Sequence, residues 1–155
     1  SRRHGAPLSL VYLDLDSFKQ INDSYGHDIG DYALKHVAYA LESHSRREDI
    51  VSRLAGDEFV IMLPETVDGA AEALMVRISD YLNRHPVAIR GTILPVSVSF
   101  GISCTVDSRI KNPDHLMQTA DERLYAAKRF KKNTQMKKNV FFPANRTECA
   151  EYSPT

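Results

Sequence analysis

The chain has 155 residues, and its 20 Lys and Arg balance its 20 Asp and Glu to a formal net charge of zero. This length can bury one hydrophobic core and leaves no room for a second enzyme domain. The balanced charge excludes the strongly basic surface typical of nucleic-acid-binding proteins, so we expect no nucleic-acid partner. Two Cys without metal-site spacing, and no apolar run of membrane-spanning length, favour a cytoplasmic domain, although a full-length protein could be anchored in a membrane.

Apolar periodicity predicts alternating strands and helices along the chain. The predicted elements are a strand over 8–15, helices near 17–25 and 28–44, a hairpin of strands near 50–55 and 59–63, a helix near 67–84, a strand over 92–104 and a helix near 113–130. Residues 140–142 form a candidate edge strand, and the polar residues 143–155 are expected to be a tail. This order predicts one α+β domain over 1–142, ferredoxin-like or of the polymerase-palm kind, with a mixed, mostly antiparallel central sheet flanked by helices.

Two acidic residues mark the end of the first predicted strand. Asp14 and Asp16 close a nearly continuous apolar run, which is typical of a strand buried on both faces. Ligands of open α/β sheets bind at strand ends, so Asp14 is well placed to hold a hard cation. Asp16 directly precedes the next helix and is a natural N-cap, so we expect it to cap the helix or to support the site.

A second acidic pair stands in the predicted hairpin. Gly56, Asp57 and Glu58 separate two apolar runs, which predicts a tight turn with both carboxylates at its tip. The Gly would let a ligand approach the backbone closely. An ordinary solvated turn is the alternative, because Gly-Asp is a common hairpin signal. Together with Asp14, these hard oxygen donors favour Mg²⁺ or Mn²⁺ over Zn²⁺ and indicate phosphoryl or nucleotidyl transfer.

Three separated segments resemble the GGDEF family of diguanylate cyclase domains. They are residues 14–31, 55–59 and 120–128; they occur in the family's order, and the resemblance covers roughly residues 8–133. Three positions depart from the family pattern. Ala55 replaces the first Gly of the signature, and Lys131-Lys132-Asn133 stands where the family usually has Gly-Arg-Asn. Lys132 keeps the charge of Arg but not its bidentate geometry.

The resemblance implies a metal site and a catalytic carboxylate. Asp14 and Asp57 match the family's metal-binding carboxylates, and the backbone carbonyl of Leu15 would complete the set around Mg²⁺ or Mn²⁺. Glu58 matches the catalytic acidic position. It would either ligate the metal or help to deprotonate the attacking 3′-hydroxyl, and the sequence leaves both roles open.

The resemblance also implies contacts to GTP. Asn22 and Asp31 match the pair that reads guanine: a carboxylate can accept from the N1–H and N2–H₂ groups of guanine, and an amide can donate to its ring acceptors. Their alternative roles are turn formation for Asn22 and an ordinary surface position on a helix for Asp31. The other implied substrate-binding residues are Lys19, Gly56, Lys128 and Lys132. A solvated helix position is the alternative for Lys19.

An Arg-x-x-Asp pattern precedes the predicted hairpin. In the family this spacing forms an inhibitory site for the product, which would use Arg46 and Asp49 here, with Arg77 as a secondary contact. The fork of Arg46 can grip guanine or phosphate, and Asp49 can accept from guanine N–H groups. The alternative is a charged loop between a helix and a strand.

The activity implied is condensation of two GTP to cyclic di-GMP and two pyrophosphates, by a homodimer with one GTP on each domain. One alternative is a GGDEF domain that binds GTP or cyclic di-GMP and signals without turnover. Another palm-type nucleotidyl transferase is a second alternative, but Asp31 suits guanine rather than adenine. The family's opening segment should precede Ser1, so we expect a piece of a longer protein with sensor or receiver domains upstream, and turnover by this piece alone is left open.

Overall fold

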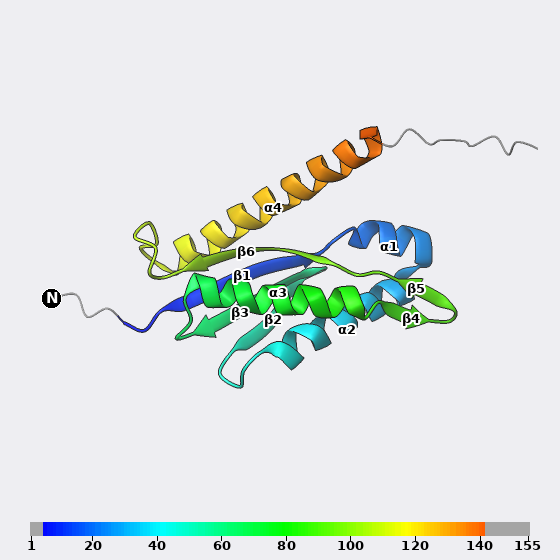
Figure 1. Cartoon of the computed structure of the whole chain (residues 1–155). Helices are drawn as coiled ribbons and strands as arrows, with labels where there is room; N and C mark the ends of the chain where they lie inside the picture. The colour runs from blue at the N-terminus through cyan, green and yellow to red at the C-terminus, as the bar shows by residue number, and fades with distance from the viewer. Residues whose placement is uncertain (1–4, 142–155) are drawn as a thin grey trace, which may run out of the picture.

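A four-stranded antiparallel sheet forms the centre of the protein (Figure 1), in a computed structural model that describes residues 5–141. Its strands are β1 (Leu8–Leu15), β2 (Ile50–Ala55), β3 (Glu58–Pro64) and β6 (Val98–Cys104), in the order β2-β3-β1-β6. β1 lies inside the sheet and is covered on both faces, which explains its nearly continuous apolar sequence. The register pairs Asp14 with Glu58 on one side and with Ser99 on the other.

Three helices cover the two faces of the sheet, α2 (His27–His44), α3 (Asp68–Arg84) and α4 (Pro113–Phe141), and α1 (Phe18–Tyr25) lies at one end of it (Figure 1). α2 and α3 pack on one face over the larger core, which contains Leu13, Val37 and Ile78. α4 crosses the other face, where Leu10 and Val60 meet Ala120. The α+β fold class predicted from the sequence is therefore confirmed.

Helix α4 approaches the sheet most closely at a glycine of β6. A Cβ atom on Gly101 would lie 2.1 Å from the carbonyl oxygen of Ala120 and 2.3 Å from the amide nitrogen of Leu124. Only a residue without a side chain fits at this crossing, so Gly101 sets the height and position of α4 above the sheet.

The predicted strand over 92–104 is wrong in its extent, because it is two separate strands. β5 (Thr92–Leu94) ends before Pro95, which has no N–H to donate to a ladder, and β6 starts at Val98. β5 pairs instead with β4 (Val87–Ile89), a strand that the sequence analysis did not predict. The turn between them, Arg90-Gly91, has positive φ at both residues, as a type I′ hairpin requires.

The candidate edge strand near residue 140 is also wrong. α4 continues past 130 to Phe141, so Val140 and Phe141 are helical. Between its start and Phe141 this segment has no Gly and no Pro after Pro113, and many strong helix formers. Phe142 and the predicted tail over 143–155 lie outside the described residues. Within residues 5–141, no helix combines the length and apolar character needed to cross a membrane.

Candidate functional site

The chain turns sharply where β1 ends. Ser17 takes a left-handed conformation with φ 58° and forms the N-cap of α1. Asp16 is therefore not the N-cap, and the capping role predicted for it is wrong. Its amide donates to the carbonyl of Ser97 at 2.8 Å, which ties the end of β1 to the segment before β6. Its predicted role in supporting the site stays a prediction.

Three donors contact the carboxylate of Asp16. Ser99 Oγ donates to Oδ1 at 2.6 Å, while Ser97 Oγ donates to Oδ2 at 2.6 Å and Lys131 Nζ donates to Oδ2 at 2.8 Å. Burial alone would raise the pKa of Asp16, but the hydrogen bonds from Lys131, Ser97 and Ser99 together hold it below its ordinary value. Asp16 therefore stays ionised near neutral pH, and both of its oxygens already accept hydrogen bonds.

Asp14 has the opposite surroundings. Only 3% of the residue is exposed, Oδ2 pairs with Lys128 Nζ, and the buried Oδ1 has no hydrogen-bond partner among the described residues. Burial is the main cause that raises the pKa of Asp14; Lys128 opposes this rise, and the nearby charges of Asp57 and Asp16 add to it. A buried, unpartnered carboxylate oxygen among other carboxylates is a place where a cation is favoured.

The β2–β3 hairpin brings its acidic tip to the same end of β1. Leu15 N–H donates to the carbonyl of Asp57 at 3.2 Å, which fastens the tip to β1. Arg53 Nε donates to the carbonyl of Gly56 at 2.8 Å and fastens it from the other side. Arg53 was not predicted from the sequence, where its signal is a long cationic side chain three residues before a turn glycine. Gly56 itself has φ 51°, a conformation that favours glycine.

Cross-strand pairing places Glu58 beside Asp14. The two residues are direct partners in the β1–β3 register, so their side chains share the face that α4 covers. Tyr12 lies on the same face, and its pKa is raised first by burial and then by the charge of Glu58. No three His, Cys, Asp or Glu among residues 5–141 form a ready-made metal cluster. The open Oδ1 of Asp14, with Asp57 and Glu58 nearby, nevertheless fits a hard cation such as Mg²⁺ or Mn²⁺.

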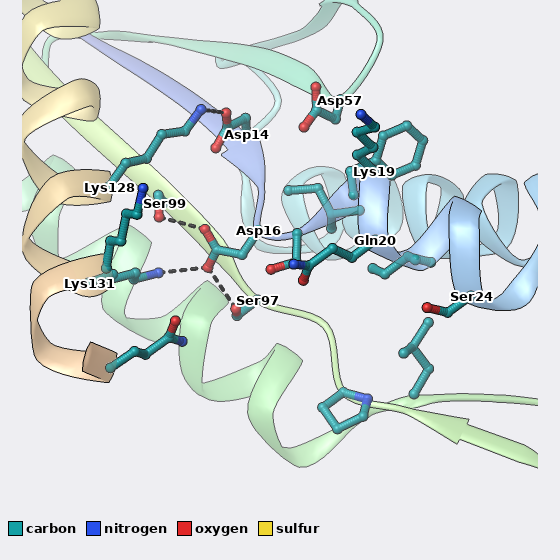
Figure 2. A pocket seen from close by; sticks show the side chains of 18 of the residues that line it. Asp14, Asp16, Lys19, Gln20, Ser24, Asp57, Ser97, Ser99, Lys128 and Lys131 are labelled. Carbon is teal, nitrogen blue, oxygen red and sulfur yellow. Dashed lines mark hydrogen bonds and ion pairs between the residues drawn. The ribbon is translucent and has the colours of Figure 1, made fainter. Parts of the chain in front are cut away.

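A cleft of about 1160 Å³ opens at this end of the sheet, between α1 and the C-terminal half of α4. It brings together six residues predicted from the sequence: Asp14, Leu15, Lys19, Asp57, Lys128 and Lys132. Figure 2 shows Lys128 and Lys131 reaching from α4 toward Asp14 and Asp16, with Lys19 on the α1 side. The cleft therefore combines carboxylates with several lysines, the charges needed for a cation and for phosphate groups.

The predicted guanine-reading residues do not line this cleft. Asp31 lines a smaller groove of about 360 Å³ between α2 and the hairpin, together with Lys35 and Arg53. Asn22 is half-buried between α1 and α2, and its Oδ1 is buried without a partner among the described residues. A Cβ at Gly30 would lie 1.8 Å from this oxygen, so Asn22 fits only against a glycine. Gly56 and Glu58 line neither the cleft nor the groove.

The predicted inhibitory residues lie elsewhere. Arg46 N–H donates to Asp49 Oδ2 at 2.7 Å, so this carboxylate closes the loop between α2 and β2. Arg46 is exposed on the loop, and Arg77 is exposed on α3. Their role in binding a product stays a prediction.

The fold and the acidic strand end define the class of this domain, a nucleotidyl-cyclase palm, and comparison with known proteins gives the family. The family model described as "Diguanylate cyclase, GGDEF domain" matches residues 1–134. The chain belongs to the GGDEF family, which confirms the resemblance stated above.

Curated relatives agree with this assignment. The chain is 39% identical over 126 residues to the response regulator PleD of Caulobacter vibrioides, covering 80% of this chain and 28% of that protein. It is 34% identical over 126 residues to diguanylate cyclase A of Treponema denticola, covering 81% of this chain and 34% of the relative. The chain thus spans about a third or less of these relatives.

Solved structures show the same fold. The GGDEF domain of YfiN (TpbB) from Pseudomonas aeruginosa matches with a TM-score of 0.76 and 32% identity, over 81% of this chain and 78% of that one. The GGDEF domain of DgcB from Caulobacter crescentus, solved in complex with c-di-GMP, matches with a TM-score of 0.70 and 26% identity, over 79% and 72% of the two chains.

Proposed function

We propose that this chain is a diguanylate cyclase domain, which joins two GTP into cyclic di-GMP and releases two pyrophosphates. The observation that carries the proposal is the cleft at the end of β1, where the open oxygen of Asp14 lies among lysines from α1 and α4. In such a cleft, a cation and a polyphosphate can bind at adjacent sites of opposite charge. The names of curated relatives such as diguanylate cyclase A support the same activity.

Asp14, Asp57, Glu58 and the carbonyl of Leu15 would hold Mg²⁺ or Mn²⁺. When bound, the ion supplies positive charge to the phosphoryl oxygens of the nucleotide. Asp14 contributes the buried oxygen that has no other partner in the described chain. Glu58 lies across the strand pair from Asp14, where it would act as a ligand or take the proton of the 3′-hydroxyl.

The lysines and the two base-reading residues would hold GTP. Lys19 and Lys128 line the cleft from opposite sides, and Lys132 lies one turn further along α4 than Lys128. They would contact the triphosphate. Asn22 and Asp31 would bind guanine by their amide and carboxylate groups, and the amide of Asn22, whose Oδ1 is buried against Gly30 without a partner in the described chain, would turn outward to do so.

Two copies of the chain would be needed for one product. Each 3′-oxygen attacks the α-phosphorus of the other GTP, so two new phosphodiester bonds form and two pyrophosphates leave. One cleft offers one set of phosphate-binding lysines and thus one GTP. A homodimer would bring two such clefts together, and domains upstream in a longer protein would control this meeting.

The decisive experiment incubates the purified chain with GTP and Mg²⁺ and separates the nucleotides by chromatography. We expect cyclic di-GMP to form in the parent, and Asp14→Asn to form none while retaining the parent's circular dichroism. A stable dimer that binds GTP and Mg²⁺ without forming product would contradict the cyclase proposal.

A binding module without turnover is the second candidate. The ion pair between Lys128 and Asp14 favours it, because it occupies one oxygen of the main metal-binding residue. Calorimetric titration with GTP and with cyclic di-GMP, combined with the chromatographic assay above, separates the two candidates, since a receptor binds at least one of them and converts neither.

Product inhibition is a further part of the proposal, through Arg46, Asp49 and Arg77. The complex of the DgcB domain with c-di-GMP supports it by analogy. Arg46→Ala should weaken cyclic di-GMP binding without changing uninhibited turnover, and identical affinities in calorimetry would show that Arg46 belongs only to a charged loop.

A further inference from the structure

The C-terminal half of α4 extends beyond the helix's apolar contacts with the sheet. The buried hydrophobic residues of the described part of α4 are Leu116, Ala120 and Leu124, and every described side chain over 125–136 is exposed or half-buried. Figure 1 shows this half rising away from the sheet above the end that carries α1. A helix segment without a buried apolar stripe needs another source of order.

Two lysines supply contacts for this half. Lys128 and Lys131 lie about one helical turn apart and reach two acidic residues at the end of β1 (Figure 2). Lys128 pairs with Asp14. Lys131 Nζ donates to Asp16 Oδ2 at 2.8 Å and to the carbonyl of Val98 at 2.6 Å. Lys131 therefore contacts both β1's end and β6, whereas Lys128 pairs with one carboxylate.

The partner of Lys131 is itself held in place. Ser97 and Ser99 each donate to the carboxylate of Asp16 at 2.6 Å, one to each oxygen. The amide of Asp16 also donates to the carbonyl of Ser97. Lys131 thus anchors α4 to a fixed carboxylate that lies 115 residues away in the sequence.

We propose that Lys131 is a positioning residue that fixes the C-terminal half of α4 as one wall of the cleft. Phe130, Lys132, Thr134 and Gln135 line the cleft from this half. Their places depend on the turn that Lys131 anchors, because no buried apolar side chain holds that turn within the described part of α4. Any effect on nucleotide binding would act through Lys132 and rests on the proposed function. The anchoring of α4 by Lys131 does not depend on that function.

Amide hydrogen exchange on the chain without nucleotide tests the anchoring. Lys131→Met keeps the apolar stem and removes the donors, whereas Lys131→Arg keeps a charged donor. Lys111→Met removes an exposed lysine from the loop before α4 and is the matched control. We expect peptides covering 125–136 to exchange about fivefold faster or more in Lys131→Met, as for loss of one partly exposed ion pair, and at parental rates in the other two.

Peptides from β1 and α2 should keep parental protection in every variant. Equal protection of 125–136 in Lys131→Met and the parent overturns the proposal. An equal loss in Lys111→Met also overturns it, because the effect would then follow total charge. If peptides from the whole chain lose protection in Lys131→Met, a local positioning role is overturned as well.

Turnover gives the second measurement. We expect Lys131→Met to raise the KM for GTP more than it lowers kcat, and Lys131→Arg to restore the parental KM. A parent that neither binds nor converts GTP but shows the expected exchange pattern contradicts the proposed function and supports the anchoring role. An unchanged exchange pattern contradicts the anchoring role whatever the enzyme does with GTP.

Discussion

Asp14 and Asp16 are two residues apart, but their neighbours differ. Burial raises the pKa of Asp14, and one of its buried oxygens has no partner in the described chain. Burial would also raise the pKa of Asp16, but donors from Lys131, Ser97 and Ser99 together lower it. We therefore expect the two carboxylates to act differently, with Asp14 open to a cation and Asp16 committed to holding the wall of the cleft.

Asp57→Asn is expected to abolish GTP turnover without unfolding the chain. The contact of Asp57 with Leu15 uses the main-chain carbonyl, which the substitution leaves intact. Loss of a metal-binding charge typically removes several kcal/mol of transition-state stabilisation, about 100-fold or more in rate. Turnover and thermal melting on the same preparations check this. The control Asp80→Asn removes an exposed charge from α3 and should retain the parental rate. If Asp57→Asn also turns over GTP near the parental rate, Asp57 does not belong to the metal site.

Asp31→Ser is expected to weaken the preference for GTP over ATP. The carboxylate would accept from guanine N–H groups, whereas adenine would present it with the acceptor N1. An unpaired buried polar group costs about 1–3 kcal/mol, which is roughly tenfold or more in affinity. Competition of ATP against GTP measures the preference, with Asp28→Ser as an exposed control on the same helix. Undiminished discrimination in Asp31→Ser would exclude Asp31 from the guanine pocket.

The residues of the site were predictable where local sequence carries them. Asp14 and Asp57 follow from acidic residues at a strand end and at a hairpin tip, and they line one cleft as expected. Lys131 was noted only as a departure from a family pattern, because its contact with Asp16 spans 115 residues and leaves no local signal. The capping role of Asp16 failed because the chain turns left-handed at Ser17, which moves the cap by one residue.

At the scale of elements, the crossing of α4 over β6 decides where one side of the cleft lies. Gly101 allows the helix backbone to rest directly on the strand. Within the N-terminal half of α4, Arg123 donates to the carbonyl of Ile102 at 2.6 Å and pairs with Asp107 in the loop before the helix. The N-terminal half of the helix is thus fixed by close packing and by one bridging arginine.

Gly101→Ala is expected to destabilise the protein by about 1–3 kcal/mol, the usual cost of overpacking a core. Its Cβ would overlap backbone atoms of α4, which have no flexible end to move aside. Gly69→Ala is the matched control, because a Cβ there meets no described atom within 4 Å and the residue lies in α3. It should be neutral or stabilising by up to about 1 kcal/mol. Urea midpoints of the three proteins measure this, and equal midpoints for both variants would contradict the close crossing.

The loop before α4 should lose its contribution to stability in acid. Hydrogen bonds from Arg109 first, and then the charges of Arg109 and Arg123, hold the pKa of Asp107 well below its ordinary value. A depressed pKa contributes stability above the unfolded value, about 4, that is lost as pH falls toward the folded value. The melting temperature of Asp107→Asn should therefore be lower than that of the parent at pH 6, and the difference should be smaller at pH 2.5. A melting difference that stays constant between these pH values would contradict this role.

The elements with long apolar periodicity were predicted well, and the short ones were not. α2 and α3 agree with their predicted ranges within a few residues, because each presents several turns of one apolar stripe. Val87–Ile89 is too short for any period to be read. The last helix was predicted to end near residue 130 because its apolar stripe stops there. In the structure, α4 extends to Phe141, which we attribute to its helix-forming residues and to the contacts of Lys131.

At the scale of the whole molecule, the described chain offers one cleft with the charges for one nucleotide and one cation. The proposed reaction joins two nucleotides, so a single copy is half of the machinery. Under the proposed function the second nucleotide site would come from another copy of the chain, and whatever brings two copies together would control the rate.

Turnover per mole of chain is therefore expected to rise with chain concentration and then level off. Rates measured over about a hundredfold range of concentration, with sedimentation on the same samples, check this because the active fraction follows the dimer fraction. A constant rate per mole across a range where the chain is a monomer would show that one copy suffices.

The walls of the cleft come from parts of the chain that are distant in sequence: residues 14–25, Asp57, residues 94–99 and residues 128–135. During synthesis the acidic end of β1 leaves the ribosome before the lysines of α4. The acidic end of β1 therefore has no contact with the lysines of α4 until α4 has been synthesised and has packed across the sheet. Under the proposed function, chains in which α4 has not yet crossed the sheet should bind no nucleotide, so nucleotide binding would begin in one folding step rather than gradually.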